Sequence, residues 1–322
     1  MIVKITNYGA IIMSVSLPQP GGTRNDIVLG FDHVADYMRE DYLANYPYFG
    51  CAVGRSANRI RNASFEIDGK KYTVTANFGQ HQLHGGKEGF DKKIWTVTAA
   101  GEQPFPYVDM QYFSPDGEEG YPGNLTVGIR FELTEDNELS YTYTAVTDQP
   151  TAVNLTHHGY FNLNNGQGDI SDYELKIYGS TILGQDEELC ANGELRPVKD
   201  TVYDFHSFTN IGERLQRIPE YDQSYVVDKN NDPDGLALMA EVRSIQSGLL
   251  LQVYATDPVV HFYTGKWIPV MTGKNNTTYG AFSALCLETQ IHPNAINIPH
   301  FPTMVLRPGE EYMSKTVYKL IG

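Results

Sequence analysis

A carboxylate in the segment Ala284-Leu285-Cys286-Leu287-Glu288-Thr289-Gln290 is the strongest candidate for chemistry in this sequence. The surrounding residues follow the apolar pattern of a strand, and a glutamate is rarely buried without a partner. Burial destabilises an ionised carboxylate, so the pKa of Glu288 should rise from its reference ~4.3 toward the range in which a carboxylate works as a base. Glu288 is therefore the first candidate for proton transfer.

Two further segments carry histidines with polar neighbours. The segment 154–163 contains the pair His157-His158, and adjacent strand residues point to opposite faces, so at most one of the two can face a pocket. Residue type and spacing leave open which one it is. In the segment 80–86, His84 precedes two glycines, which let the backbone approach a ligand closely. A polar loop without function explains that segment equally well.

An amide and two arginines interrupt the apolar run that follows Tyr48. Arg59 follows Asn58 and precedes Ile60, where a guanidinium would be partly buried and would need acceptors. A hydroxyl-rich ligand could supply them. Arg55 is expected to be an ordinary solvated surface residue. Asp222 adds a second carboxylate ahead of another strand-like run, a position that is also common for a turn.

Short strands must position these residues. Apolar and polar residues alternate between positions 11 and 17, which predicts a strand with one face inside. The segment 64–74 contains Asp68-Gly69, a pair that tolerates positive φ at both turn positions and predicts a tight hairpin. Alternation over 125–133, a polar break, and renewed alternation over 139–143 predict a second antiparallel pair.

Helical periodicity is confined to the segments 32–44 and 211–218, which predict single turns or short helices. Thirty glycines, 17 prolines and 22 tyrosines among short alternating runs favour an all-β chain with many turns. We find no linker, composition shift or repeat, so residues 1–322 are expected to form a single domain.

Composition excludes several classes of function. Lys and Arg number 24 against 39 Asp and Glu, a net charge of −15, which argues against nucleic acids and anionic membranes as partners. No apolar stretch approaches the ~18 residues that span a bilayer. The start does not resemble a secretory signal, and three cysteines, Cys51, Cys190 and Cys286, cannot all pair internally, so a cytoplasmic location is expected.

Taken together and in this order, these segments resemble the aldose 1-epimerase (galactose mutarotase) family. The resemblance covers essentially the whole chain and rests on these further motifs: Asn7-Tyr8-Gly9-Ala10, Gly30-Phe31-Asp32, Gly120-Tyr121-Pro122-Gly123, Tyr263-Thr264-Gly265 and Leu306-Arg307-Pro308-Gly309-Glu310. It implies a large antiparallel β-sandwich of the galactose mutarotase-like kind, with few short helices. It also implies an isomerase that interconverts the α and β anomers of free aldohexoses such as glucose and galactose, without a cofactor or metal.

The resemblance also implies roles for single residues. Glu288 matches the catalytic base, and His158, the second of the paired histidines, matches the catalytic acid. The matched substrate-binding positions are Asn58, Arg59, His84, Asp222, His261 and Trp267, the last of which could lie against the apolar face of the sugar. This sequence departs from the family pattern at His157, where Asn or a small residue is usual, and at His261, where some members have Gln.

The implied reaction removes a proton from the anomeric hydroxyl and gives one to the ring oxygen. The open aldehyde turns about its C1–C2 bond and then recloses. We expect Glu288 as a carboxylate and His158 as an imidazolium near neutral pH, because their reference pKa values are ~4.3 and ~6.5.

Three alternatives remain from the sequence. The first is a hexose-6-phosphate 1-epimerase on the same fold, which would need clustered arginines near the cleft, and few are present beyond Arg55, Arg59 and Arg61. The second is a carbohydrate-binding protein without catalysis. The third is a metal site made of two histidines and one carboxylate, His84, His158 and Glu288.

Overall fold

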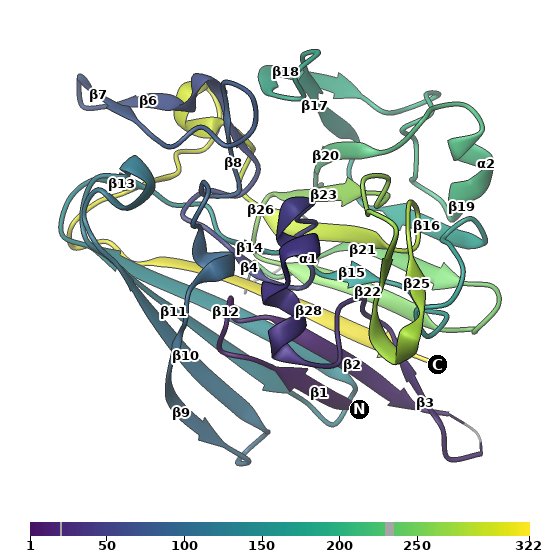
Figure 1. The fold of residues 1–322 in the computed structure, drawn as a ribbon. Coiled ribbons are helices and arrows are strands. Elements are labelled where there is room, and N and C mark those ends of the chain that lie inside the picture. Colours follow the sequence, from purple (N-terminus) through teal and green to yellow (C-terminus); the bar gives the residue numbers. More distant parts are fainter. Residues whose placement is uncertain (20, 229–234) are drawn as a thin grey trace.

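Strands dominate the computed structural model, which describes residues 1–19, 21–228 and 235–322 (Figure 1). The largest sheet has nine strands, each antiparallel to its neighbours. In spatial order these are β19 (Thr209–Asn210), β16 (Tyr173–Ile177), β21 (Ala237–Ser244), β22 (Leu250–Ala255), β28 (Tyr312–Ile321), β12 (Glu138–Thr147), β11 (Leu125–Leu133), β10 (Tyr107–Ser114) and β9 (Thr96–Gly101).

A second antiparallel sheet has six strands, and a third has three. The six are β15 (Tyr160–Phe161), β26 (Leu285–Gln290), β23 (Val259–Tyr263), β20 (Asp222–Val226), β17 (Thr181–Gln185) and β18 (Ala191–Pro197). The three are β1 (Ile2–Ile5), β2 (Ile12–Pro18) and β3 (Arg24–Asp26).

Short strand pairs and single helical turns connect the sheets. The pairs are β4 (Ala52–Val53) with β14 (Thr156–His157), β5 (Arg59–Ile60) with β8 (Gln82–Leu83), β6 (Ser64–Ile67) with β7 (Lys70–Thr73), β13 (Thr151–Ala152) with β27 (Val305–Leu306), and β24 (Met271–Thr272) with β25 (Thr278–Tyr279). The α-helices are α1 (Glu40–Ala44) and α2 (Ile211–Leu215), and the 3-10 turns are η1 (Val34–Met38), η2 (Arg61–Ala63), η3 (Phe90–Lys92), η4 (Glu118–Gly120), η5 (Lys274–Asn276) and η6 (Ala295–Asn297).

The main hydrophobic core lies between the nine-stranded and six-stranded sheets. Apolar residues of β11, β12, β21 and β22 meet apolar residues of β20, β23 and β26 there. Each strand places alternate side chains on opposite faces, so one face of the six-stranded sheet fills this core and the other is left for polar residues. The predicted all-β sandwich with few short helices is confirmed.

The predicted local elements are largely confirmed. Asp68 and Gly69 join β6 to β7 with φ of 52° and 79°, as the hairpin requires. β11 and β12 form the expected second antiparallel pair, and η1, α1 and α2 are the expected short helices. The strand near the N-terminus differs from the prediction, because Ser14 and Ser16 of β2 are also buried. This strand is covered on both faces.

Among the described residues, no helix combines the length and the apolar character needed to cross a membrane.

Candidate active site

Three neighbouring strands of the six-stranded sheet build one wall of the candidate site. Ser224 of β20 stands opposite His261 of β23, which in turn stands opposite Glu288 of β26. Residues that are directly opposite share one face of a sheet, so these polar side chains point the same way. The intervening apolar residues of the same strands, such as Phe262 and Leu287, lie in the main core. Because successive side chains of a strand alternate between the two faces of the sheet, the same strands supply apolar residues to the core and polar residues to the site.

His158 enters the site from the connection between β14 and β15. Its backbone N–H donates to Cys51 O (2.9 Å), and its carbonyl accepts from the Gly50 N–H (2.9 Å). His157 points away into the core, where its ring contacts those of Phe131 and Tyr141 and its Nε2 lies 3.2 Å from Ala10 O. The alternation of a strand thus turns one histidine of the pair toward Glu288 and the other into the core.

His84 is held by the pairing of β5 with β8. Its backbone N–H donates to Asn58 O (3.0 Å), and the Asn58 backbone N–H donates to Nδ1 of the His84 ring (3.2 Å). The chain then turns sharply at Gly85, where a Cβ would lie 1.8 Å from Gly54 O. The glycine after His84 is therefore required by the close approach of another backbone segment.

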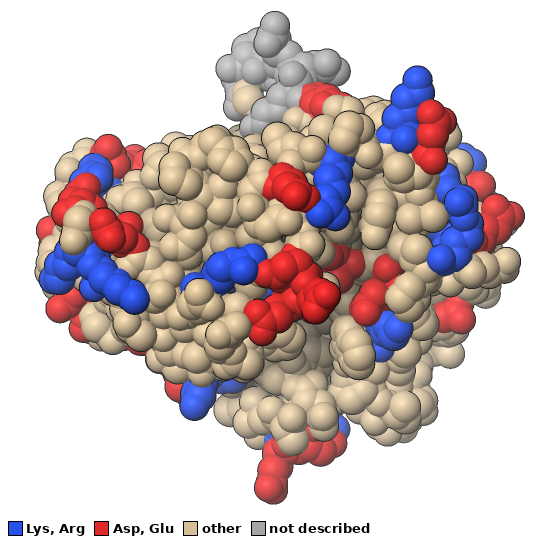
Figure 2. All heavy atoms as spheres, turned by 90° about the horizontal axis from the view of Figure 1, so that it is seen from above, with Lys and Arg blue, Asp and Glu red and all other residues tan. Residues whose placement is uncertain are grey.

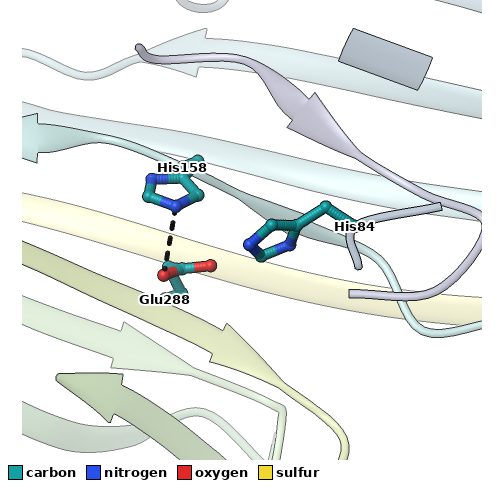
Figure 3. A group of neighbouring side chains, drawn as sticks. All are labelled: His84, His158 and Glu288. Carbon is teal, nitrogen blue, oxygen red and sulfur yellow. Dashed lines mark ion pairs between the residues drawn. The ribbon is translucent and has the colours of Figure 1, made fainter. Parts of the chain in front are cut away.

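His84, His158 and Glu288 converge on one point (Figure 3). Their ligand atoms all lie within 4.8 Å of one another, and His158 Nε2 is 3.6 Å from Glu288 Oε1. The side chains are nearly covered, with relative exposures of 2% for Glu288 and 4% for His158. The atoms that would exchange protons with a ligand thus face each other in a shielded space.

Burial shifts the two ionisable groups in opposite directions. Desolvation raises the pKa of Glu288 to about 7, which is the direction expected from the sequence. Desolvation lowers the pKa of His158 to about 3, helped by the nearby His261. The expected imidazolium is therefore wrong for the unliganded site. Between about pH 3 and pH 7 the pair of Glu288 and His158 therefore holds one proton, and burial places that proton on Glu288.

The bond from Asn58 determines the tautomer of His84. Burial lowers the pKa of the His84 ring well below its usual value, so the ring is neutral. Because Nδ1 accepts the Asn58 N–H, the ring proton is on Nε2. A nitrogen that carries a proton donates hydrogen bonds and does not ligate a metal. The cluster of His84, His158 and Glu288 thus has metal-like spacing, but the donor set does not fit a metal ion.

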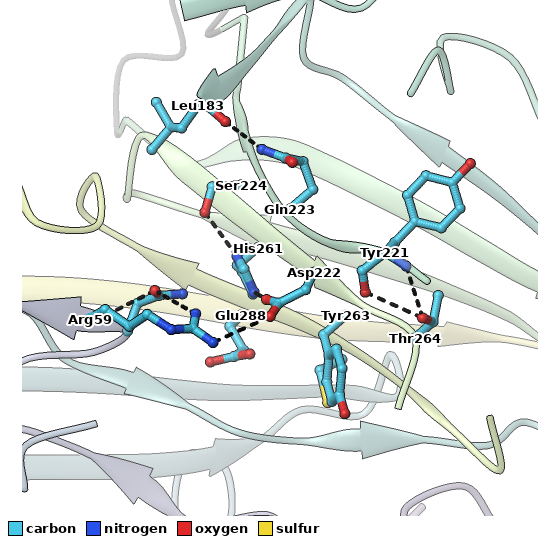
Figure 4. Close-up of polar contacts among 12 residues, drawn as sticks. Arg59, Leu183, Tyr221, Asp222, Gln223, Ser224, His261, Tyr263, Thr264 and Glu288 are labelled. Carbon is cyan, nitrogen blue, oxygen red and sulfur yellow. Dashed lines mark hydrogen bonds and ion pairs between the residues drawn. The ribbon is translucent and has the colours of Figure 1, made fainter. Parts of the chain in front are cut away.

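A chain of polar contacts extends from this cluster along the sheet (Figure 4). Asp222 lies between two donors, His261 Nε2 at 2.7 Å from Oδ1 and Arg59 Nη2 at 3.5 Å from Oδ2. His261 Nδ1 lies 2.8 Å from Ser224 Oγ. Burial alone would raise the pKa of Asp222, but the bond and charge of His261 and the charge of Arg59 lower it far below its usual value. Asp222 is therefore an anion, and His261 Nε2 must carry the proton of their hydrogen bond.

Arg55 corrects a prediction made from the sequence. It is 2% exposed, not solvated, and its guanidinium donates five hydrogen bonds, to the Ser114 hydroxyl and carbonyl, the Thr151 hydroxyl, and the carbonyls of Pro115 and Pro122. Desolvation lowers its pKa to about 10. Arg55 is occupied in the structure and does not reach the site.

Trp267 lies at the edge of the site and is 68% exposed. Its backbone N–H donates to the hydroxyl of Tyr263 (2.7 Å), which lies on the same face of β23 as His261. Its ring is therefore mostly exposed to solvent, with Lys266 Nζ 5.8 Å from the ring centroid, rather than being part of the core.

Two tyrosines in the site were not identified from the sequence. The ring of Tyr160 stacks on His158 (centroids 4.9 Å apart, 15° between planes), and that of Tyr48 also lies nearly parallel to it (5.9 Å, 14°). Tyr48 additionally contacts the ring of His84 (4.8 Å). It is partly exposed, so it borders the space between the histidines. The only sequence signal was the aromatic run Tyr46-Pro47-Tyr48-Phe49, which reads as ordinary core.

The site is more exposed at Asp222 than at its other ionisable groups. The side chain of Asp222 is 14% exposed, against 7% for Arg59, 5% for His158 and 2% for Glu288. The face at the top of Figure 1 is hollowed near its middle, and acidic side chains are grouped around the hollow (Figure 2). A neutral polar ligand suits such an opening better than an anionic one.

Known proteins resemble this chain along nearly its full length. Residues 1–319 match the family described as aldose 1-epimerase. Galactose mutarotase of Sus scrofa is 39% identical over 318 residues (98% of this chain, 89% of that one), and aldose 1-epimerase of Escherichia coli (strain K12) is 33% identical (100% and 92%). A solved aldose epimerase homologue from C. elegans superposes with a TM-score of 0.90 at 30% identity, over 99% of this chain and 95% of that one.

Proposed function

This chain belongs to the aldose 1-epimerase family and is an isomerase, and on that premise we propose that Glu288 and His158 are its proton-transfer couple. One observation carries the proposal: His158 Nε2 and Glu288 Oε1 face each other at 3.6 Å in a shielded site. A sugar whose anomeric hydroxyl meets Glu288 and whose ring oxygen meets His158 would insert between these atoms. Such placement allows general acid–base catalysis of ring opening.

The protonation states give the order of events. In the unliganded site the single proton of the couple is on Glu288. Hydroxyls of a bound sugar replace part of the hydration that burial removed, which favours the charged arrangement with a Glu288 carboxylate and a His158 imidazolium. Glu288 then takes the proton of the anomeric hydroxyl while His158 protonates the ring oxygen. The open-chain aldehyde leaves Glu288 protonated and His158 neutral, and reclosure reverses both transfers.

The remaining polar groups would bind the other hydroxyls. His84 offers an Nε2–H donor, because its tautomer is determined by Asn58. The Asp222 carboxylate would accept hydrogen bonds from sugar hydroxyls, and the Arg59 guanidinium would donate them. The two side chains also hold each other in place, with Arg59 Nη2 3.5 Å from Asp222 Oδ2. Trp267, exposed at the edge, would cover the apolar face of the ring. Together these groups would hold a pyranose in register with the couple.

We propose free aldohexoses such as galactose and glucose as substrates, in line with the relatives named galactose mutarotase. A 6-phosphate would need a cationic pocket. The three arginines considered for it are engaged: Arg55 in the core, Arg59 with Asp222, and Arg61 in an ion pair with Asp186. This favours an uncharged sugar over a hexose 6-phosphate.

We further propose that residues 1–322 act as one domain in the cytoplasm, without nucleic-acid or membrane partners. Cys51, Cys190 and Cys286 are all free and buried, which suits a reducing compartment.

Polarimetry of freshly dissolved α-galactose and α-glucose tests the catalytic proposal. Glu288→Gln keeps the shape of the side chain but cannot take a proton, so the rate should fall by at least about 10²-fold, while sugar binding measured by calorimetry persists. A Glu288→Gln rate within tenfold of wild type would remove Glu288 from the base role. Equal rates with glucose and glucose 6-phosphate would contradict the substrate assignment.

A further inference from the structure

His261 occupies a central place between both carboxylates of the site, yet the proton transfers described above do not use it. It stands directly opposite Glu288 on the neighbouring strand, and its two ring nitrogens are engaged by Asp222 (2.7 Å) and Ser224 (2.8 Å). It is almost completely buried. A buried imidazole held at both nitrogens has a fixed orientation, so the Asp222 carboxylate that it contacts is held with it.

The groups around His261 come from several elements. Ser224 and Asp222 belong to β20 and Glu288 belongs to β26. Arg59 of β5 reaches the far oxygen of Asp222, and the neutral rings of His84 and His158 lie beyond. Arg59 and His261 thus hold the two oxygens of the Asp222 carboxylate from different sides.

We propose that His261 is a positioning residue: its ring, oriented by Ser224, holds the Asp222 carboxylate toward the sugar through the Nε2–H bond. This inference rests on the proposed function. A Gln amide at this position can still donate to Asp222, whereas a Leu side chain cannot. The hydrogen bond to Asp222 is thus what the site needs from this residue.

The test compares KM and kcat of wild type, His261→Gln and His261→Leu by polarimetry. His261→Leu should raise KM about tenfold or more, since Asp222 loses its donor. His261→Gln should keep KM within a few-fold of wild type, because its amide replaces that donor. A KM for His261→Leu that equals the wild-type value overturns the proposal.

His157→Gln is the matched control, because it changes a neighbouring buried histidine that points into the core. Its KM should coincide with that of wild type even if its stability falls. Should the His261 variants not fold, 15N-histidine spectra of the wild-type protein decide: Nε2 of His261 must stay protonated from about pH 5 to 9, since Asp222 only accepts. A loss of that proton within this range contradicts the proposal. Failure of the proposed function is distinguishable, because it would leave Glu288→Gln active.

Discussion

His158 Nε2 lies 3.6 Å from Glu288 Oε1, and burial shifts the pKa of the two groups past each other, to about 3 and about 7. In the reference state the histidine would hold its proton to higher pH than the glutamate. The site reverses this order, so the couple's single proton rests on the group proposed as the base. Sugar binding must move this proton from Glu288 to His158 before the ring opens. Ring closure starts with the proton on Glu288, as in the site without sugar.

The pH dependence follows from that proton count. The pair of Glu288 and His158 carries one proton between about pH 3 and pH 7 and none above, because the raised pKa of Glu288 governs the loss. We expect kcat/KM to be level in the mildly acidic range and to fall about tenfold per pH unit well above the pKa of Glu288, about 7. Polarimetric rates from pH 5 to 9 check this. A kcat/KM that rises through pH 7 would mean that an ionised Glu288 beside a neutral His158 is the active form.

Chelation should leave the activity unchanged. The Asn58 N–H places the ring proton of His84 on Nε2, so this cluster binds hydroxyls rather than a metal ion. Overnight dialysis against EDTA, followed by polarimetry, provides the measurement, with a known zinc enzyme treated in parallel. Activity that disappears on dialysis and returns with Zn²⁺ would show that the cluster functions as a metal site after all.

Strand alternation explains why much of the site was visible in the sequence. Glu288 interrupts an apolar strand, and such an interruption in a core-forming pattern marks a polar face directly. Adjacent residues alternate, so the pattern also showed that only one of His157 and His158 could face the site. The resemblance to the aldose 1-epimerase family then distinguished between them.

Other features depend on contacts that are distant in sequence. Arg55 is buried because acceptors near residues 114, 122 and 151 surround it, and no local pattern shows this. The aromatic run around Tyr48 has the composition of ordinary core, and only the fold brings this ring against two histidines. The charge of His158 was predicted incorrectly for the same reason, because reference pKa values contain no burial.

Tyr48→Ala should lower kcat/KM by about tenfold, because its ring supports both His84 and His158 and each such contact is worth about 0.5–1.5 kcal/mol. Tyr48→Phe keeps the ring and should remain within a few-fold of wild type. Tyr72→Ala, in the hairpin strand β7, removes a tyrosine that contacts Phe65 and serves as the control. Polarimetric initial rates for the three variants check the prediction. Equal rates for Tyr48→Ala and wild type would contradict it.

Arg55→Ala should destabilise the protein by about 3 kcal/mol or more, because several buried acceptors lose a charged donor at once. Arg130→Ala is the matched control: that arginine is exposed, lies over the ring of Tyr107 (4.6 Å) and pairs at the surface with Asp109, an ion pair worth about 0–1 kcal/mol. Urea unfolding followed by circular dichroism measures both free energies. The order matters more than either value, since a burial-dependent role predicts a large cost at Arg55 and a small one at Arg130. Similar losses for the two variants would mean that the Arg55 cluster is not an internal support of the fold.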